Sequence, residues 1–195
     1  ISYDTLKQRV YDGLLLQTRP KPYMDGIRLV ISPAGLAMDF GGVDAVFQAR
    51  FDESPAEAVR DLLDLQRVAG KDLTRLGWEG YGQLRDWVAT AAADPTLKSA
   101  LMPALGDFGY TGLGTGGIGT RGNDVVVGQD AGAVLNGNGG SDLVLGGAGD
   151  DTLNGGAGDD ILYGGAGNDT YIFNLGDGRD TIVETRGDMG EDALR

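Results

Sequence analysis

A nine-residue repeat fills most of the second half of this chain and limits what it can fold into. Seven units align between Gly119 and Val183, with two extra residues before the last unit. The sixth position is aspartate in every unit except the second: Asp124, Asp142, Asp151, Asp160, Asp169 and Asp180. The eighth position is always apolar: Val126, Leu135, Val144, Leu153, Leu162, Tyr171 and Ile182. A unit this short cannot bury its own apolar side chain, so neighbouring units must stack.

The spacing within each unit predicts a turn followed by a short strand. Six residues of the form G-G-x-G-x-D make the turn, and three make a strand whose middle side chain points inward. Two units then form one coil of 18 residues, with a thin core between two parallel sheets. Turns on the same side lie two units apart, so one row holds Asp124, Asp142, Asp160 and Asp180, and the other holds Ala133, Asp151 and Asp169. A flexible linker would not keep this apolar register.

Such a stack is unfavourable without a cation between its turns. Residues 111–195 contain 24 of the 35 glycines, which lose the most conformational entropy on ordering. They also contain 14 acidic and four basic residues, so rows of carboxylates repel one another. Calcium fits best because it accepts 6–8 hard oxygen ligands, backbone carbonyls included. Magnesium demands a rigid octahedral site and suits carbonyl cages less well.

The predicted calcium ligands are the repeat aspartates and the backbone carbonyls of the turns. Beside the six aspartates at the sixth position, they are Gly119, Arg121, Gly137, Asn138, Gly139, Gly140, Gly146, Gly147, Ala148, Gly149, Gly155, Gly156, Ala157, Gly158, Gly164, Gly165, Ala166 and Gly167. We expect three sites, between the turns that end in Asp124 and Asp142, Asp142 and Asp160, and Asp151 and Asp169. A fourth between Asp160 and Asp180 is compatible with the insertion, and the pairing of Ala133 with Asp151 should be weak or empty, so five is the upper limit.

The units of Gly146–Ile172 read GGAGDDTLN, GGAGDDILY and GGAGNDTYI. This pattern resembles the haemolysin-type, or RTX, calcium-binding nonapeptide repeat G-G-x-G-x-D-x-U-x. The resemblance implies a parallel β-roll that binds calcium, in a toxin-related bacterial protein exported by type I secretion and located outside the cell. Tyr171–Glu184 looks like the end of such an array. Residues 1–110 look like the stretch that precedes the repeats in very large RTX exoproteins, including the iron-regulated, self-processing type.

The chain departs from the family pattern in its first two units. The second unit has Ala133 in place of aspartate, and the first has Thr120 and Arg121 where the family prefers glycine and a small residue. Three further aspartates lie at other turn positions. We expect Asp150 and Asp159 to be solvated and Asp177 to be a turn residue.

The fold class predicted from these patterns is α+β: a mainly helical capping domain, residues 1–110, followed by the β-roll, residues 119–184. A glycine-rich connector, 111–118, joins them, and 185–195 form a tail. Residues 27–31 and 36–40 are expected to form a hairpin. We expect the helical domain to cover the open sheet edges at the N-terminal end of the roll.

Several helices are expected before residue 110. The apolar spacing of Tyr3, Leu6, Val10 and Leu14 predicts the first. Ser54-Pro55-Ala56-Glu57 reads as a capping box at the start of a helix that ends near Gly70. Leu84, Trp87, Val88 and Ala91 form another apolar stripe, and Asp94-Pro95 reads as an N-cap followed by proline. We expect Trp78, Tyr81 and Trp87 to pack in the core and not to form a sugar-binding platform.

Composition excludes several classes of site. The chain has no cysteine and no histidine, which excludes disulfides, thiolate zinc sites and serine-type triads. The net charge of −13 argues against binding to nucleic acid. No apolar run reaches the about 20 residues needed to span a bilayer. The first residue is Ile1, so we expect a part of a longer polypeptide, and we expect it to be monomeric.

Three functional hypotheses follow. The first is a non-catalytic module that folds on calcium binding after export, with calcium ions and the type I secretion machinery as partners. The second is a segment of an adhesin or surface-layer protein that calcium rigidifies. The third is an auxiliary module of a secreted enzyme or toxin, or a unit that cleaves itself at Asp94-Pro95.

Overall fold

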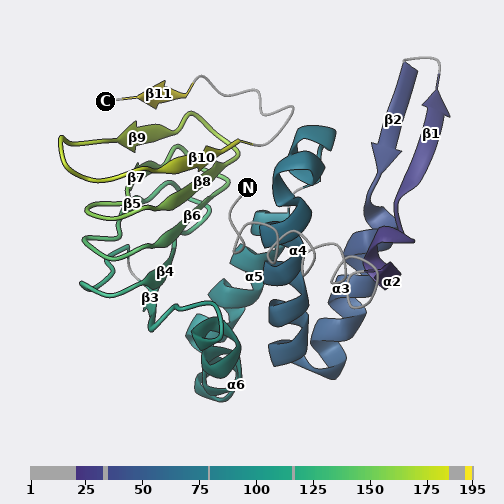
Figure 1. Cartoon of the computed structure of the whole chain (residues 1–195), viewed down its shortest axis with the longest axis horizontal. Coiled ribbons are helices and arrows are strands. Elements are labelled where there is room, and N and C mark those ends of the chain that lie inside the picture. Colours follow the sequence, from purple (N-terminus) through teal and green to yellow (C-terminus); the bar gives the residue numbers. More distant parts are fainter. Residues whose placement is uncertain (1–20, 33–34, 79, 116, 185–191, 195) are drawn as a thin grey trace, which may run out of the picture.

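The computed structural model describes residues 21–32, 35–78, 80–115, 117–184 and 192–194. Helices occupy the first half of the chain, and a parallel β-roll occupies the second (Figure 1). The predicted fold class is therefore confirmed. The helix expected around Tyr3–Leu14 lies outside the described residues. Among the described residues, no helix combines the length and apolarity that a membrane span requires.

The helical half contains one short and four longer helices in its described part. They are α2 (Lys21–Met24), α3 (Gly41–Glu53), α4 (Pro55–Leu76), α5 (Gly80–Ala93) and α6 (Pro95–Gly106). The predicted hairpin is present as β1 (Arg28–Ser32) and β2 (Gly35–Asp39), which pair antiparallel with Arg28 opposite Asp39.

The ends of α4 differ from the prediction. The helix begins at Pro55 as expected, but the side chain of Ser54 makes no capping hydrogen bond. Glu57 accepts a hydrogen bond from Arg60 instead (2.6 Å), so no capping box forms. The helix also continues through Gly70 to Leu76 and ends at Gly77, whose φ of 103° suits glycine. A glycine within a helix is tolerated where packing stabilises the helix, and the next glycine provides the stop.

The predictions for α5 and α6 are confirmed. Asp94 Oδ1 accepts hydrogen bonds from the amides of Thr96 (2.8 Å) and Leu97 (3.2 Å), so Asp94 is the N-cap of α6. The apolar stripe of α5 is buried: Leu84, Trp87, Val88 and Ala91. Trp78 and Trp87 are buried in the core, as predicted, and Tyr81 is partly buried against it. In the same core, Tyr23 stacks on Phe47 and Phe51 stacks on Trp87.

The roll consists of two parallel sheets. The first, which we call the helix-facing sheet, has the order β10-β8-β6-β4-β3, and the second, the open sheet, has the order β11-β9-β7-β5. The helix-facing sheet contains β3 (Gly112–Thr115), β4 (Asp124–Val127), β6 (Leu143–Gly147), β8 (Ile161–Gly165) and β10 (Thr181–Val183). The open sheet contains β5 (Val134–Asn136), β7 (Thr152–Asn154), β9 (Thr170–Ile172) and β11 (Ala193–Leu194).

The coil of 18 residues predicted from the repeat is observed as the strand register. Val126 pairs with Val144, and Leu135 pairs with Leu153. The eighth-position side chains form a separate core between the two sheets: Val126, Leu135, Val144, Leu153, Leu162 and Tyr171, each at most 1% exposed.

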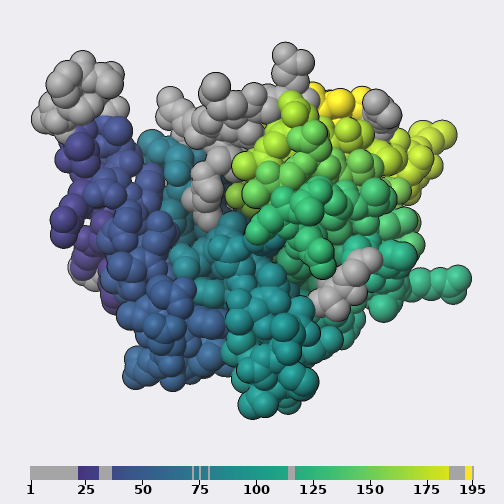
Figure 2. All heavy atoms as spheres, turned by 180° about the vertical axis from the view of Figure 1, so that it is seen from behind, coloured from purple at the N-terminus to yellow at the C-terminus, as the bar shows by residue number. Residues whose placement is uncertain are grey.

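The two sheets differ on their outer faces. In the helix-facing sheet, the seventh and ninth positions are also apolar and belong to the core of the helical half: Val125, Val127, Leu143, Leu145 and Tyr163. In the open sheet, Thr152 and Asn154 at the same positions are only partly buried. Helix α5 contacts β3, β4 and β6 (Figure 1), and Figure 2 shows the two halves packed together from the opposite side.

The helices therefore lie along the outer face of a sheet, whereas we expected them over its N-terminal edge. That edge is formed by β3, which pairs in parallel with β4 from Gly112–Asp124 to Thr115–Val127. The helices lie on the outer face because the apolar side chains there must be buried, and the helices bury them.

Candidate metal centre

The repeat aspartates form two hydrogen-bonded ladders along the roll. In each ladder, Oδ1 of an aspartate accepts a hydrogen bond from the backbone amide at the same position of the preceding turn. Asp124 N donates to Asp142 (2.7 Å), Asp142 N to Asp160 (2.7 Å) and Asp160 N to Asp180 (3.1 Å). In the second row, Ala133 N donates to Asp151 (2.6 Å) and Asp151 N to Asp169 (2.8 Å). The structure therefore contains the two rows of aspartates that the repeat spacing predicts. Asp180 belongs to the first row despite the two-residue insertion.

The other carboxylate oxygen of these aspartates, Oδ2, takes no part in the ladder. Oδ2 of Asp142, Asp151 and Asp160 is buried and accepts no hydrogen bond. Each of these residues is 1% exposed. A buried carboxylate oxygen without a partner is unfavourable unless a proton or a cation satisfies it.

Backbone carbonyl oxygens face the same points as these free carboxylate oxygens. A methyl group placed on Gly137 would clash with both Asp142 Oδ2 and the carbonyl oxygen of Gly155, in the next turn of the row. In the other row, a methyl group on Gly146 would clash with both Asp151 Oδ2 and the carbonyl oxygen of Gly164. Glycine at the first position of the turn therefore leaves space for a carboxylate oxygen and a carbonyl oxygen to converge.

The electrostatics of the ladder favour a positive partner. The pKa of Asp142 is raised to about 7, mainly by burial. The hydrogen bond from the Asp124 amide opposes the rise, and the neighbouring carboxylates of Asp160 and Asp124 contribute to it. Burial likewise raises the pKa of Asp160, with contributions from Asp180, Asp177 and Asp159. At neutral pH these groups are therefore costly to ionise without a cation beside them.

The donor set fits calcium. The available ligands are carboxylate and carbonyl oxygens, which hard divalent cations prefer. Among the described residues, no group of three or more acidic side chains is close enough to hold a metal ion by itself, so the carbonyls of the turns are needed. Asp142 with the Gly155 carbonyl, Asp151 with the Gly164 carbonyl, and Asp160 are the residues that would hold the ions.

The first two turns differ from the later ones. Asp124 Oδ2 accepts hydrogen bonds from the amide (2.5 Å) and the hydroxyl (2.7 Å) of Thr120. In the second turn, which lacks its aspartate, Asp130 forms an ion pair with Arg85 of α5. Arg121, a predicted carbonyl ligand, lies exposed in the first turn.

Asp150 and Asp159 are exposed, as expected, and each also bridges two turns. Asp150 Oδ1 accepts a hydrogen bond from Asn168 N (2.8 Å), and Asp159 Oδ1 accepts one from Arg179 N (2.9 Å). Asp177 Oδ2 accepts a hydrogen bond from Asn174 N (2.6 Å), which makes Asp177 a turn residue.

Asp192 is a member of the second row that the sequence prediction missed. Asp169 N donates to Asp192 Oδ1 (2.8 Å), and Ala193 and Leu194 pair in parallel with Thr170 and Tyr171. We assigned 185–195 to a tail, but 192–194 extend the open sheet. A signal was present, because residues 187–195 read GDMGEDALR, with aspartate at the sixth and leucine at the eighth position.

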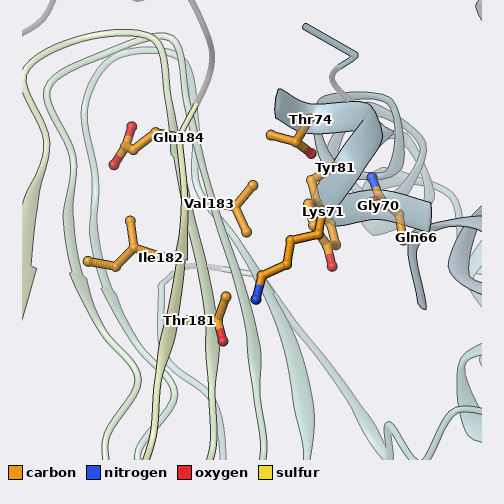
Figure 3. A pocket seen from close by; sticks show the side chains of 9 residues that line it. All are labelled: Gln66, Gly70, Lys71, Thr74, Tyr81, Thr181, Ile182, Val183 and Glu184. Carbon is orange, nitrogen blue, oxygen red and sulfur yellow. The ribbon is translucent and has the colours of Figure 1, made fainter. Parts of the chain in front are cut away.

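A cavity of about 630 Å³ lies between α4 and β10, away from these turns (Figure 3). The side chain of Lys71 extends from α4 toward Thr181 of β10, and Glu184 lies at the other side of the strand. Burial raises the pKa of Glu184 to about 7. Three residues of the last repeat unit, Thr181, Ile182 and Val183, line the cavity together with residues of α4, Tyr81 of α5 and Glu184. The carboxylates of Asp192 and Asp169 in the second row of the ladder also contribute to the raised pKa of Glu184.

The ladder agrees with what comparison with known proteins shows. Residues 136–171 match the family described as the RTX calcium-binding nonapeptide repeat, in four copies. The iron-regulated protein FrpA of Neisseria meningitidis serogroup C is 33% identical over 86 residues, which are 44% of this chain and 6% of that protein. No solved structure matches the chain significantly. Residues 136–171, which the structure folds as part of the parallel β-roll, are thus similar to the calcium-binding nonapeptide repeats of the RTX, or haemolysin, type.

Proposed function

We propose that this chain is a non-catalytic, calcium-responsive module of a secreted RTX protein, which folds its roll when it binds calcium outside the cell. The observation that carries the proposal is the set of buried, unpartnered Oδ2 atoms of Asp142, Asp151 and Asp160. In the first two cases, a carbonyl oxygen of the next turn faces the same point. RTX nonapeptide repeats bind calcium, and they are typical of secreted bacterial proteins.

The proposed sites follow the direction of the ladder. Asp142 and the Gly155 carbonyl would hold one ion, and Asp151 and the Gly164 carbonyl a second. Asp160 and the turn that ends in Asp180 would hold a third. Each ion would neutralise a carboxylate whose pKa burial raises, and it would join two turns that otherwise repel each other.

Folding would then depend on the calcium concentration. Extracellular calcium modules bind with dissociation constants of about 10⁻⁴–10⁻³ M. In a cytosol poor in calcium, glycine entropy and carboxylate repulsion would keep the repeats unfolded for export. Outside the cell, the free energy of calcium binding would drive folding of the roll.

A calcium titration of the whole chain followed by circular dichroism tests the proposal. We expect helical signal in excess chelator and a large gain of β signal at millimolar calcium. Magnesium at the same concentration serves as the control and should produce little change. An unchanged spectrum across the calcium titration would remove the proposal.

A further inference from the structure

In the first coil of the roll, residues 119–136, hydrogen bonds and ion pairs with other protein groups take the place that a cation would have in the later coils. In its first turn, the Thr120 amide and hydroxyl occupy the oxygen of Asp124 that the later aspartates leave without a hydrogen bond. Thr120 stands at the second position of the turn, where the later turns of the same row have asparagine or glycine. The first turn therefore needs no cation to satisfy its buried carboxylate.

The second turn of this coil receives its positive charge from the helical half. Arg85 of α5, with a side chain 14% exposed, forms ion pairs with Asp130 and with Asp86 (2.8 Å). Nη2 of Arg85 would lie 3.1 Å from a methyl group on Gly147, so the guanidinium also adjoins the next turn of the same row. Arg85 therefore lies beside the turn that has Ala133 in place of aspartate.

One of the two strands of the first coil, β4, is enclosed by protein on both faces. In β4, all four residues are buried. Val125 and Val127 face the helical core, and Val126 faces the core of the roll. On its edge, β4 pairs along its whole length with β3, which follows the helices directly in the chain. Apolar burial and backbone pairing thus stabilise this coil independently of any ion.

We infer that the first coil folds without calcium and that the later, calcium-dependent coils pack onto it. Arg85 joins the first coil to the helical half, and Thr120 satisfies the buried carboxylate of Asp124. This inference rests on the proposed function, because it divides the roll into a part that needs calcium and a part that does not. It gives folding a direction, from the helices toward the C-terminus. A stack of repeats propagates from a formed unit more readily than it starts anew, since a neighbour supplies the pairing surface.

Hydrogen exchange with peptide-level mass spectrometry on the whole chain tests the inference. In excess chelator we expect protected amides in 124–127 and in the helices, and rapid exchange in 152–183. Millimolar calcium should then protect 152–183. If 124–127 exchange as rapidly as 152–183 in chelator, while calcium protects both, the inference is overturned and the proposed function stands. If calcium protects neither, the proposed function fails.

Two variants test whether Arg85 and Thr120 are responsible for the protection of 124–127 in chelator. Arg85→Ala should remove protection of 124–127 in chelator, leave the helices protected and raise the calcium concentration for half-maximal folding several-fold. Arg179→Ala is the charge-matched control, because Arg179 lies on the roll with a side chain 90% exposed. It should leave the protection of 124–127 unchanged. Thr120→Val removes the hydroxyl at similar volume and should also lower this protection. If Arg85→Ala and Thr120→Val both keep wild-type protection in chelator, the assigned roles are wrong.

Discussion

The amide of Asp124 donates a hydrogen bond of 2.7 Å to Oδ1 of Asp142, 18 residues later in the chain. Repetition of this bond along each row leaves Oδ2 of Asp142, Asp151 and Asp160 for another partner. One carboxylate thus does two things: one oxygen fixes the spacing of the turns, and the other is available to a cation.

Asp142→Asn should remove one calcium ion and leave the ladder bond possible, because the amide oxygen still accepts from Asp124 N. We expect one ion fewer per chain by native mass spectrometry. The calcium needed for half-maximal folding should increase about tenfold, which corresponds to about 1.4 kcal/mol. Asp150→Asn is the matched control, since Asp150 is exposed and stands at the fifth position of its turn. Equal losses in the two variants would contradict the assigned ligand.

Gly146→Ala should disrupt a site without changing any charge. The added methyl group would clash with Asp151 Oδ2 and the carbonyl oxygen of Gly164. Overpacking of this kind costs about 1–3 kcal/mol. Chemical denaturation in saturating calcium measures the loss. Gly106→Ala, at the end of α6, places its methyl in open space and should be nearly neutral. A neutral Gly146→Ala would show that the turn does not need glycine there.

Leu145→Asp should separate the roll from the helices. Leu145 is fully buried on the outer face of the helix-facing sheet, in the core of the helical half. A charge there would be buried without a partner, and we expect severe destabilisation. Val134→Asp is the control, because Val134 lies on the open sheet and is 76% exposed. If both variants unfold at the same denaturant concentration, the outer faces of the two sheets do not differ as the structure indicates.

The pH dependence should reverse between metal-free and calcium-bound protein. In the metal-free roll, burial raises the pKa of Asp142 to about 7, above the value near 4 of an unfolded aspartate. The folded state then binds more protons between pH 4 and 7, so its stability falls as the pH rises through this window. Bound calcium favours the ionised carboxylates, so acid should release the ions.

Circular dichroism from pH 7.5 to 5 measures both effects. In calcium-free buffer, acid should increase β signal, and at limiting calcium it should decrease the fraction of calcium bound. An equal calcium affinity at both pH values would contradict the role of the buried carboxylates.

The repeat predicted the roll because a period of nine residues fixes both the strand register and the row to which each aspartate belongs. What it did not predict is the difference between the sheets. Alternate units read VVV, LVL and ILY against VLN, TLN and TYI, so the additional apolar positions marked the sheet that the helices cover. The eighth position alone is apolar in both sheets, so by itself it does not show which outer face the helices cover.

Other features depend on contacts that local sequence does not contain. The pair of Arg85 with Asp130 joins residues 45 apart, from a helix and a turn. The missing capping box results from competition, because Glu57 pairs with Arg60. Asp192 escaped the prediction because three residues separate Val183 from the unit that begins at Gly187, which breaks the period.

The central claim is that calcium joins successive turns through the free oxygens of the aspartate ladder. A crystal structure of the chain grown with millimolar calcium, with anomalous difference density measured, tests this most directly. We predict density peaks bounded by Asp142 Oδ2 and the Gly155 carbonyl, and by Asp151 Oδ2 and the Gly164 carbonyl. A roll that is folded as described, but has no such peaks between its turns, would contradict the account.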